Sequence, residues 1–355
     1  MSNNKNVYWL EEIEPNNMYI AGRKCCGLGE MSRNNLPVPP GFAVSLYAYQ
    51  KFIDETGLGK EILAYFKENR KKMAEDVGLF EEAHVYIDGL VNSKPMPTEI
   101  EEDILNHYRE LSQKCQIENV SVAVRSSGPV SMPGQFDTFL NVKGEEALLK
   151  HVIKVWASSF NARAMSYRLQ RNMPIESSPI GVAVLKMVNA KSSGVMFTLD
   201  PLNGDRSKIF IEGSWGLGES LVSGQVTPDK YTVDKVLMTV NKRVICNKAI
   251  EMNYDPEGNI VPVDVEPDRQ EVSCLSDEEI LQVACLGKRV EQHYKLPQDI
   301  EWALDKDFTF PDNIFLLQTR PETIWNKKEA KPIVEPKKSA LEYITSNLLT
   351  GKKLG

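Results

Sequence analysis

Two strand-like segments late in the chain carry polar side chains that could bind a metal ion and phosphate. Residues 299–304 (DIEWAL) and 313–320 (NIFLLQTR) are largely apolar, which predicts two buried strands. Glu301 lies in the first, and Gln318 and Arg320 share a face of the second because they are two residues apart. If the strands pair, these groups suit Mg²⁺ and polyphosphate. An Arg320–Glu301 salt bridge that closes a hairpin is the open alternative.

A second basic residue, Arg125, ends another short apolar run. Residues 122–124 (VAV) predict a strand, and residues 125–129 (RSSGP) interrupt it. Backbone N–H groups in such a loop can approach phosphate oxygens, and a guanidinium supplies bidentate charge. A turn at 132–134 (MPG) then leads to a strand over 138–142. An ordinary turn with no ligand is the alternative.

Near the start, residues 19–30 (YIAGRKCCGLGE) place Arg23 and Lys24 among glycines. We interpret this stretch as a glycine-flanked turn. Its two cations could reach phosphate, or the turn could simply be solvated.

The remaining patterns predict the elements that position these residues. Ser45 is the expected N-cap of a helix to about Thr56. Residues 59–114 have helical spacing, with breaks near Gly78 and at 94–97, and residues 145–172 predict one long helix.

Strands are expected later, followed by one more helix. The strands are at 180–188, 194–198, 208–213 and, as hairpins, 230–250. The glycine-rich residues 215–224 suggest a loop close to a ligand. Ser276 and Glu279 fit a capping box for a helix to Tyr294.

Composition describes an ordinary globular protein. The 355 residues are 42% hydrophobic and 26% charged, which allows two lobes around sizeable cores. A net charge of −7 argues against a nucleic-acid-binding surface. No apolar run spans a membrane, the N-terminus lacks a signal-peptide pattern, and the six cysteines form no CxxC pair. We therefore expect a cytoplasmic protein with reduced thiols.

Taken in order, these segments resemble the nucleotide-binding domain of the phosphoenolpyruvate synthase and pyruvate phosphate dikinase family. The resemblance covers nearly all of residues 7–325, and its 131–141 loop (SMPGQFDTFLN) is closer to the dikinase version. The matching motifs are Gly22-Arg23-Lys24 with Leu28-Gly29-Glu30, Val38–Phe42, Val124–Ser127, Ser131–Asn141, Ser193–Pro201, Trp215–Asp229 and Asp299–Thr323. Two positions depart from the family pattern: Arg23 replaces a glycine and Leu185 replaces a glutamine.

The resemblance implies an α/β (α+β), bilobed ATP-grasp fold whose lobes close on ATP and Mg²⁺. Residues 1–178 would form the N-terminal lobe, 179–326 the C-terminal lobe, and 327–355 a linker and tail. It also implies site roles. Lys24, Arg125 and Arg320 would hold phosphates and act in catalysis, Gly134 and Thr138 would belong to the phosphate-covering loop, and Glu301 and Gln318 would ligate Mg²⁺.

The implied chemistry transfers the β,γ-pyrophosphoryl group of ATP to a histidine and releases AMP and phosphate. None of the histidines, His84, His107, His151 and His293, lies in the family's phosphohistidine context. We therefore expect a separate partner subunit that carries the phosphohistidine and the acceptor site.

The leading hypothesis is a stand-alone ATP-binding subunit similar to the smaller subunit of phenylphosphate synthase, with phenol as the final acceptor. The alternatives are an isolated ATP domain of a phosphoenolpyruvate synthase or antibiotic phosphotransferase, an ATP-grasp ligase that forms ADP, and a non-catalytic nucleotide sensor. The lysine-rich tail could dock the partner or be a linker.

Overall fold

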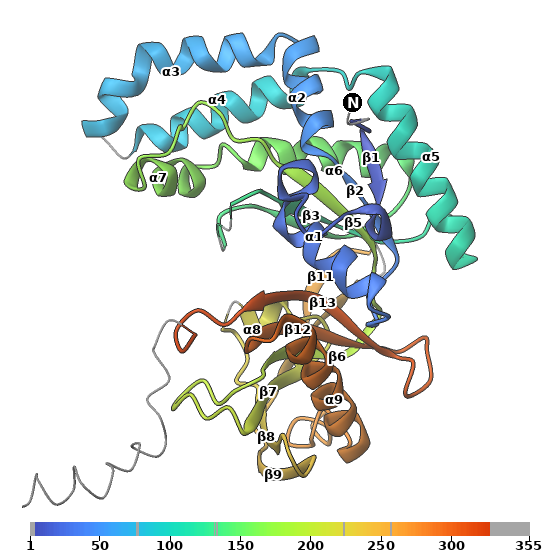
Figure 1. Cartoon of the computed structure of the whole chain (residues 1–355). Helices are drawn as coiled ribbons and strands as arrows, with labels where there is room; N and C mark the ends of the chain where they lie inside the picture. The colour runs from blue at the N-terminus through green and yellow to red at the C-terminus, as the bar shows by residue number, and fades with distance from the viewer. Residues whose placement is uncertain are drawn as a thin grey trace, which may run out of the picture.

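The structure is a computed structural model, which describes residues 4–75, 78–130, 132, 134–222, 224–255 and 258–326. Two antiparallel β-sheets form the centres of two lobes, drawn one above the other in Figure 1. This is the mixed α/β, bilobed architecture that the sequence predicts. The predicted tail at 327–355, with its docking or linker role, lies outside the described residues.

The first lobe contains a sheet with strand order β1-β2-β5-β3-β4. Most of its helices lie away from the second lobe, whereas α1 lies next to that lobe (Figure 1). The strands are β1 (Val7–Trp9), β2 (Gly41–Val44), β3 (Val122–Ser127), β4 (Thr138–Val142) and β5 (Gly181–Lys186). The helices are η1 (Leu10–Glu12), α1 (Met18–Arg33), α2 (Leu46–Glu55), α3 (Leu58–Glu75), α4 (Leu79–Ser93), α5 (Thr98–Cys115), α6 (Glu145–Ser158) and α7 (Ala162–Gln170).

The second lobe contains a sheet with strand order β13-β12-β6-β7-β8-β9, on which helix α9 packs. A hairpin, β10–β11, forms a smaller sheet beside it. The strands are β6 (Ala190–Phe197), β7 (Lys208–Trp215), β8 (Asp229–Asp234), β9 (Thr239–Val244), β10 (Ile250–Tyr254), β11 (Ile260–Asp264), β12 (Gln298–Asp305) and β13 (Ile314–Pro321). The helices are α8 (Glu219–Val222) and α9 (Asp277–Tyr294).

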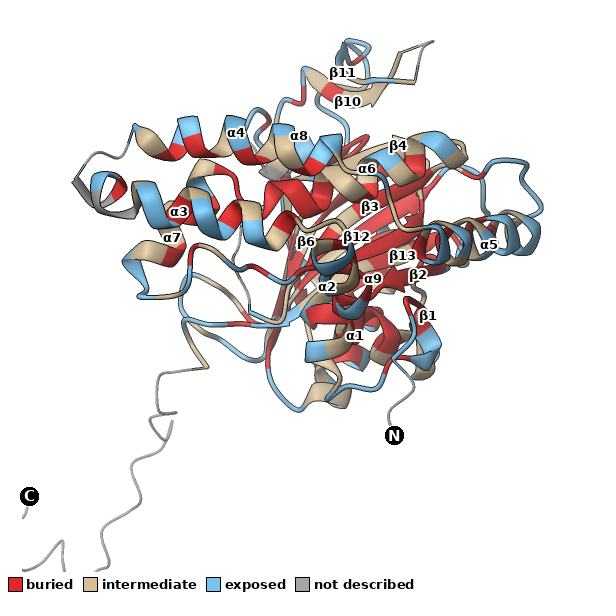
Figure 2. Cartoon of the chain, turned by 90° about the horizontal axis from the view of Figure 1, so that it is seen from above, coloured by how far each residue is buried: buried red, intermediate tan, exposed pale blue. Residues whose placement is uncertain are grey.

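Buried side chains concentrate on the helix faces that meet the sheets (Figure 2). In the first lobe, the fully buried Trp156 of α6 packs against Phe52 of α2, with ring centroids 5.0 Å apart. Full burial of such a large apolar side chain is worth about 1.5–3 kcal/mol. These contacts fix the sheet that carries Arg125.

In the second lobe, the Trp302 side chain lies across two glycines of neighbouring strands. A Cβ at Gly194 would lie 2.8 Å from the Trp302 ring, and one at Gly213 would lie 3.0 Å from it. Trp302 is fully buried. Because side chains alternate along a strand, the neighbouring Glu301 then faces the opposite side of the sheet.

Several local predictions are confirmed. The Ser45 side chain caps α2 by accepting a hydrogen bond from the Ala48 N–H, and Ser276 forms the predicted capping box with Glu279. Helices α3, α4 and α5 are separated at the predicted breaks. All six cysteines lie in the described residues and are unpaired. Among the described helices, none combines the length and apolar character needed to cross a bilayer.

The single helix predicted over 145–172 is wrong, because the first helix ends at Ser158 and a second begins at Ala162. The structure has α6 and α7 instead, and the Asn161 side chain caps the second by accepting a hydrogen bond from the Ala164 N–H at 2.8 Å. Asparagine is a strong helix N-cap, so a new start is stabilised within an otherwise continuous apolar pattern.

The glycine-flanked turn predicted at 19–30 is also wrong: these residues lie in helix α1, apart from a kink at Gly22. Gly22 has φ 79°, and a Cβ there would lie 2.0 Å from the Ser127 carbonyl oxygen. Gly29 allows η1 to approach closely, since a Cβ there would lie 2.3 Å from the Leu10 carbonyl oxygen. Gly22 and Gly29 therefore allow close packing of neighbouring backbone segments.

The predicted lobe boundary at 178/179 differs from the sheet topology. Strand β5, which follows that boundary, lies between β2 and β3 in the first sheet. The next strand, β6, belongs to the second sheet. The chain therefore passes between the sheets at residues 187–189, one strand later than predicted.

Candidate functional site

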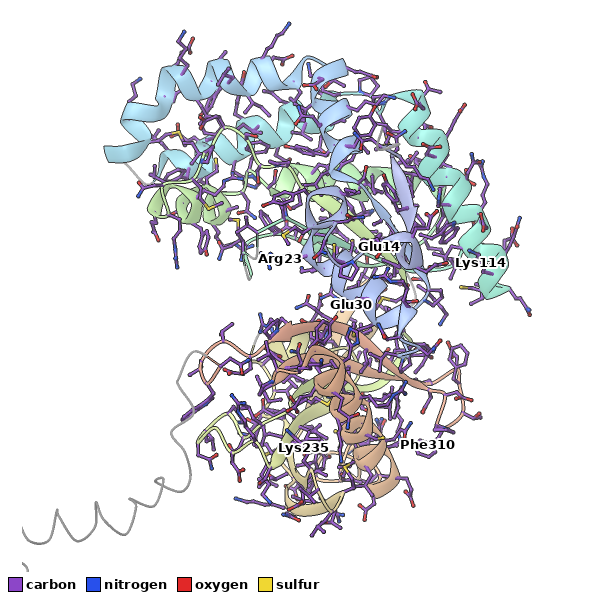
Figure 3. The ribbon with its side chains drawn as sticks, in the orientation of Figure 1. Glu14, Arg23, Glu30, Lys114, Lys235 and Phe310 are labelled. Atoms are coloured by element: carbon purple, nitrogen blue, oxygen red, sulfur yellow. The ribbon has the colours of Figure 1, made fainter. Side chains whose placement is uncertain are left out.

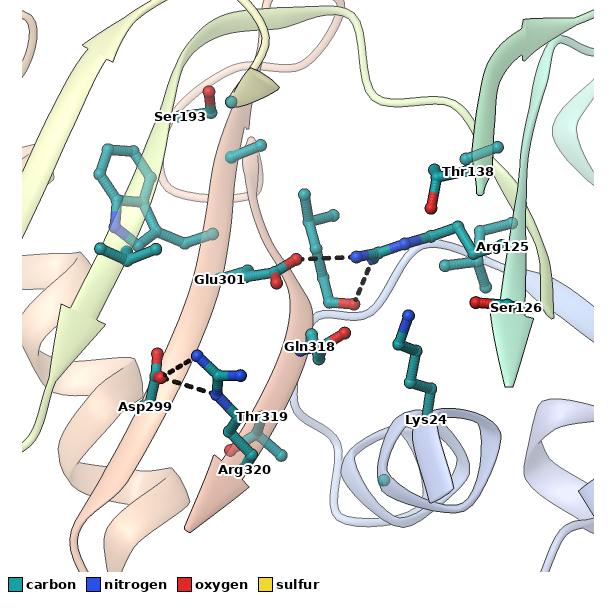
Figure 4. Close-up of a pocket in the computed structure, with 18 of the residues that line it drawn as sticks. Lys24, Arg125, Ser126, Thr138, Ser193, Asp299, Glu301, Gln318, Thr319 and Arg320 are labelled. Atoms are coloured by element: carbon teal, nitrogen blue, oxygen red, sulfur yellow. Dashed lines mark hydrogen bonds and ion pairs between the residues drawn. The ribbon is translucent and has the colours of Figure 1, made fainter. Parts of the chain in front are cut away.

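A cleft of about 1150 Å³ lies between the lobes and is lined by residues of both. All the residues predicted to form the site contribute to its walls. They are Lys24, Arg125, Gly134, Thr138, Glu301, Gln318 and Arg320. Figure 4 shows Arg125 and Lys24 on the first-lobe side, pointing toward Glu301 and Gln318 on the second.

The strands β12 and β13 pair, which was the condition for Glu301 to share a face with Gln318 and Arg320. Glu301 lies directly opposite Gln318, and Asp299 lies opposite Arg320. Since directly opposed residues of an antiparallel pair point to the same face, Glu301, Gln318 and Arg320 share the cleft face. A register shift follows Glu301 on this pair of strands.

Arg125 joins the two lobes through its guanidinium. It donates a hydrogen bond to the Glu301 carboxylate at 2.9 Å and one to the Leu317 carbonyl at 3.2 Å. Its Nε atom is buried and has no hydrogen-bond partner among the described residues. A buried donor without a partner is costly, so a ligand oxygen at this position would stabilise the site.

The alternative Arg320–Glu301 salt bridge is wrong, because Arg320 pairs with Asp299 instead. Arg320 Nε and one terminal nitrogen lie 2.7 and 2.6 Å from Asp299 Oδ2. The sequence reasoning did not single out Asp299. Its position two residues before Glu301, on the same strand face, was the signal that could have revealed it.

Lys24 enters the cleft from α1, just after the kink at Gly22. Burial, together with the nearby charge of Arg125, lowers the pKa of its ammonium group to about 8, although Glu301 opposes this shift. Burial and like charge both disfavour a cation, so the Lys24 ammonium group lies beside Arg125 in an unfavourable position in the free cleft. An anion would relieve this repulsion.

The two carboxylates of β12 that line the cleft respond differently to it. Burial raises the pKa of Glu301, but the charges of Arg125, Lys24 and Arg320 outweigh it and leave the pKa below its usual range. Burial raises the pKa of Asp299, and Arg320 offsets only part of that effect. Glu301 is therefore the carboxylate held ionised by the surrounding cations.

The loop after β3 forms another part of the wall. Thr138 lies opposite Arg125 in the β3–β4 pair, and Gly134 is exposed with φ +68°. Apart from its chain neighbours, no described residue has an atom within 4 Å of the position of a Cβ at Gly134. Glycine is therefore favoured there by backbone conformation rather than by lack of space.

Away from these charged groups, the cleft wall is apolar. Leu185, one of the two departures from the family pattern, is buried in this wall. Other apolar residues of the wall include Val188, Ala190, Leu217 and Met252. An apolar cavity with a few convergent polar groups is the usual form of a small-molecule site.

The four histidines, all in the described part of the chain, do not line the cleft. His107 packs against Trp9 and Phe42, His151 against Phe139, and His293 Nε2 lies 2.8 Å from Glu30. A histidine that reacted with a ligand in the cleft would therefore have to come from elsewhere.

Comparisons with known proteins show the family of the chain. Residues 18–341 match the family model described as "Pyruvate phosphate dikinase, AMP/ATP-binding domain". Among solved structures, D-alanyl-alanine synthetase A from Vibrio cholerae aligns with 62% of this chain and 46% of its own at 12% identity. The TM-score of this alignment is 0.28, and we draw no conclusion from that likeness.

Curated relatives are much more similar in sequence. Proteins named probable phosphoenolpyruvate synthase from Staphylothermus marinus and phosphoenolpyruvate synthase from Aeropyrum pernix are 40% and 38% identical across 93% and 92% of this chain. The chain spans only 43% and 44% of their lengths. It belongs to the pyruvate phosphate dikinase AMP/ATP-binding domain family.

Proposed function

We propose that the cleft binds ATP in the ATP-grasp manner and supports transfer of its β,γ-pyrophosphoryl group to a histidine of a partner subunit. The observation that carries this proposal is the convergence of Lys24, Arg125 and Arg320 on one part of the cleft, facing Glu301 and Gln318. Preorganised cations of this kind stabilise charge that develops during phosphoryl transfer.

The residues present fit Mg²⁺ in their chemistry. A carboxylate and an amide, from Glu301 and Gln318, offer oxygen ligands in register on adjacent strands. The described residues contain no group of three or more His, Cys, Asp or Glu placed to hold a metal ion. This suits Mg²⁺, which usually takes one or two protein ligands and completes its shell with phosphates and water. When bound, it would neutralise charge on the phosphate oxygens.

The protein groups then have distinct roles. Lys24 and Arg320 hold the polyphosphate, and Arg125 exchanges part of its contact with Glu301 for the transferring group. A bond forms between a histidine nitrogen and the β-phosphorus while the bond from that phosphorus to the α–β bridging oxygen breaks, which releases AMP. Hydrolysis of the remaining phosphoanhydride then releases the γ-phosphate.

The test uses ATP labelled separately at the β and γ positions, with Mg²⁺. The chain is incubated alone and with a cell extract of its source that supplies the partner. AMP formation and β-label on a second polypeptide, seen only with both present, are the expected results. ADP formed by this chain alone, with no labelled partner, would overturn the proposal in favour of a kinase or ligase. ATP binding without any turnover would favour a nucleotide sensor.

The final acceptor is a separate part of the proposal. The relatives described above are named phosphoenolpyruvate synthases, which favours pyruvate. Phenol, the acceptor of a phenylphosphate synthase, remains the hypothesis from the sequence, and the nucleotide cleft carries no information on it. Adding pyruvate or phenol to the labelled partner distinguishes them, because only the true acceptor removes the label from the protein.

A further inference from the structure

Helix α1 and the segment that follows β3 are joined by a run of hydrogen bonds at the edge of the cleft. Ser127 Oγ donates to the Ala21 carbonyl at 2.7 Å and accepts from the Cys25 N–H at 3.1 Å. The Arg23 N–H donates to the Gly128 carbonyl at 2.9 Å. The kink at Gly22 brings the two backbones close enough for these bonds.

The Arg23 side chain extends this run by one residue. Its Nε donates to the Pro129 carbonyl at 2.8 Å. Proline has no N–H, so its carbonyl is the backbone group by which position 129 can be held. Arg23 itself is exposed and lines the cleft, and Figure 3 shows it on the side of the first lobe that faces the second.

Beyond Pro129 the chain enters the wall of the cleft. Val130, Met132 and Gly134 all line it, and at the other end of this loop Asn161 Nδ2 donates to the Gln135 carbonyl at 2.6 Å. The loop is therefore held at one end by Arg23 and at the other by Asn161. The Arg23 contact comes from the residue directly before Lys24, so it couples the loop to the helix that carries the phosphate-binding lysine.

We propose that Arg23 is a positioning residue, which holds Pro129, and with it the cleft-lining residues Val130, Met132 and Gly134, beside the polyphosphate of a bound nucleotide. This inference rests on the proposed function, because it assumes that the nucleotide in this cleft is ATP. The departure from glycine at position 23 thus adds an anchor. It imposes no strain, because the unusual backbone angles belong to Gly22 and not to Arg23.

The test compares Arg23→Met, Arg23→Lys and a control, Arg206→Met, in the full chain. Methionine keeps an unbranched stem and the backbone bond to Gly128 but removes the donor. Lysine can still donate to a carbonyl, although without the fixed geometry of a guanidinium. Arg206 is an exposed arginine before β7 that does not line the cleft.

Hydrogen exchange of residues 128–136 and the affinities for ATP and AMP, each with Mg²⁺, are measured for every variant. In Arg23→Met we expect faster exchange of this segment, an ATP Kd raised about tenfold, and an unchanged AMP Kd, since AMP lacks the phosphates that the loop covers. Arg23→Lys should recover most of the ATP affinity. Arg206→Met should match the wild type.

Unchanged exchange in Arg23→Met, or equal weakening of ATP and AMP, would overturn the inference. If the wild-type chain itself bound no ATP, the proposed function would fail and the covering role with it. If the wild type bound ATP and Arg23→Met bound it equally well, only the role of Arg23 would fail. The two failures are therefore distinguishable.

Discussion

Two ion pairs in this protein have similar chemistry but different surroundings. Lys248 and Asp229, in the second lobe, lie 2.7 Å apart, and both side chains are 0% exposed. Arg125 and Glu301, in the cleft, lie 2.9 Å apart, with side chains 16% and 32% exposed. The first pair lies within one lobe, whereas the second joins the two lobes.

The two pairs differ in how many of their polar atoms have hydrogen-bond partners. Asp229 Oδ1 accepts from Lys248 and from the Cys246 N–H at 2.9 Å, and Oδ2 accepts from the Cys274 N–H at 2.9 Å and the Tyr231 hydroxyl at 3.1 Å. In the cleft pair, Arg125 Nε has no partner among the described residues. A fully satisfied pair has no capacity for a ligand, whereas an incompletely satisfied one can exchange partners.

Of the ion pairs compared, Lys248–Asp229 should contribute most to the free energy of unfolding. Replacing Lys248 with Met leaves the Asp229 carboxylate buried without its cation, and breaking such a pair costs about 3–5 kcal/mol. We expect the free energy of unfolding, measured by urea denaturation, to fall by about this amount. ATP affinity of the folded fraction should not change, and a stability loss below about 1 kcal/mol would show that this pair is as weak as an exposed one.

The Arg125–Glu301 pair should affect catalytic turnover more than the other ion pairs do. Arg125→Ala is expected to reduce AMP formation in the presence of the partner by about 100–1000-fold, the usual effect of removing one charge-stabilising donor. ATP binding should weaken far less, because Lys24 and Arg320 remain. Calorimetry for binding and labelled-ATP turnover separate the two effects. Equal losses of binding and turnover would contradict a catalytic role for Arg125.

The cleft should also respond to pH through Lys24. The pKa of Lys24 is lowered to about 8 in the free protein, and bound phosphates should raise it again. ATP affinity should therefore fall by up to about tenfold per pH unit above pH 8, with proton uptake on binding. Calorimetry in buffers of different ionisation enthalpy measures that uptake, which should be absent in Lys24→Met.

Without ligand, the lowered pKa of Lys24 makes stability rise with pH, whereas it makes ATP affinity fall. The unfolded chain keeps the Lys24 proton up to its ordinary pKa of 10.5, whereas the folded chain releases it from about 8. The contribution of Lys24 to the free energy of unfolding therefore rises with pH across this window. The Lys24→Met variant should lose this rise; a wild-type curve identical to that of the variant would contradict the shifted pKa.

A third ion pair, which is exposed to solvent, should contribute least to the free energy of unfolding. Arg243 and Asp277 lie 2.7 Å apart, with side chains 44% and 64% exposed. Exposed pairs contribute about 0–1 kcal/mol, so Arg243→Met should change the free energy of unfolding by less than about 1 kcal/mol. The same urea denaturation measures it. A loss comparable with that of Lys248→Met would mean that burial does not explain the difference between the pairs.

The part of the site that follows from local patterns was predictable from sequence. The two-residue alternation of β13 placed Gln318 and Arg320 on one face, and the pairing with β12 adds Glu301 to that face. The glycine content of 19–30 was misleading, because Gly29 serves close helix packing rather than a turn. The partners of the charged groups were not predictable: Arg125 and Glu301 are 176 positions apart in the chain, so no local pattern relates them.

The lobe boundary was missed for a similar reason. Strand β5 has the same apolar composition as the strands after it, and only its long-range pairing with β2 and β3 assigns it to the first sheet. The family resemblance supplied the set of site residues, and the structure brings that set into one cleft. The catalytic roles of those residues are what the variants above test.

Among the described residues, two backbone connections link the lobes: the covalent segment at residues 187–189, and a hydrogen bond that the Leu316 N–H of β13 donates to the Pro37 carbonyl at 2.7 Å. The Lys306 N–H donates to the Asn189 carbonyl at 2.8 Å, which ties the end of that segment to the second lobe. Two fixed points define an axis, and a rigid body held at two points can move only by rotating about it. If the side-chain contacts across the cleft exchange while these two connections persist, the lobes rotate about this axis, and the parts of the cleft rim farthest from it travel farthest.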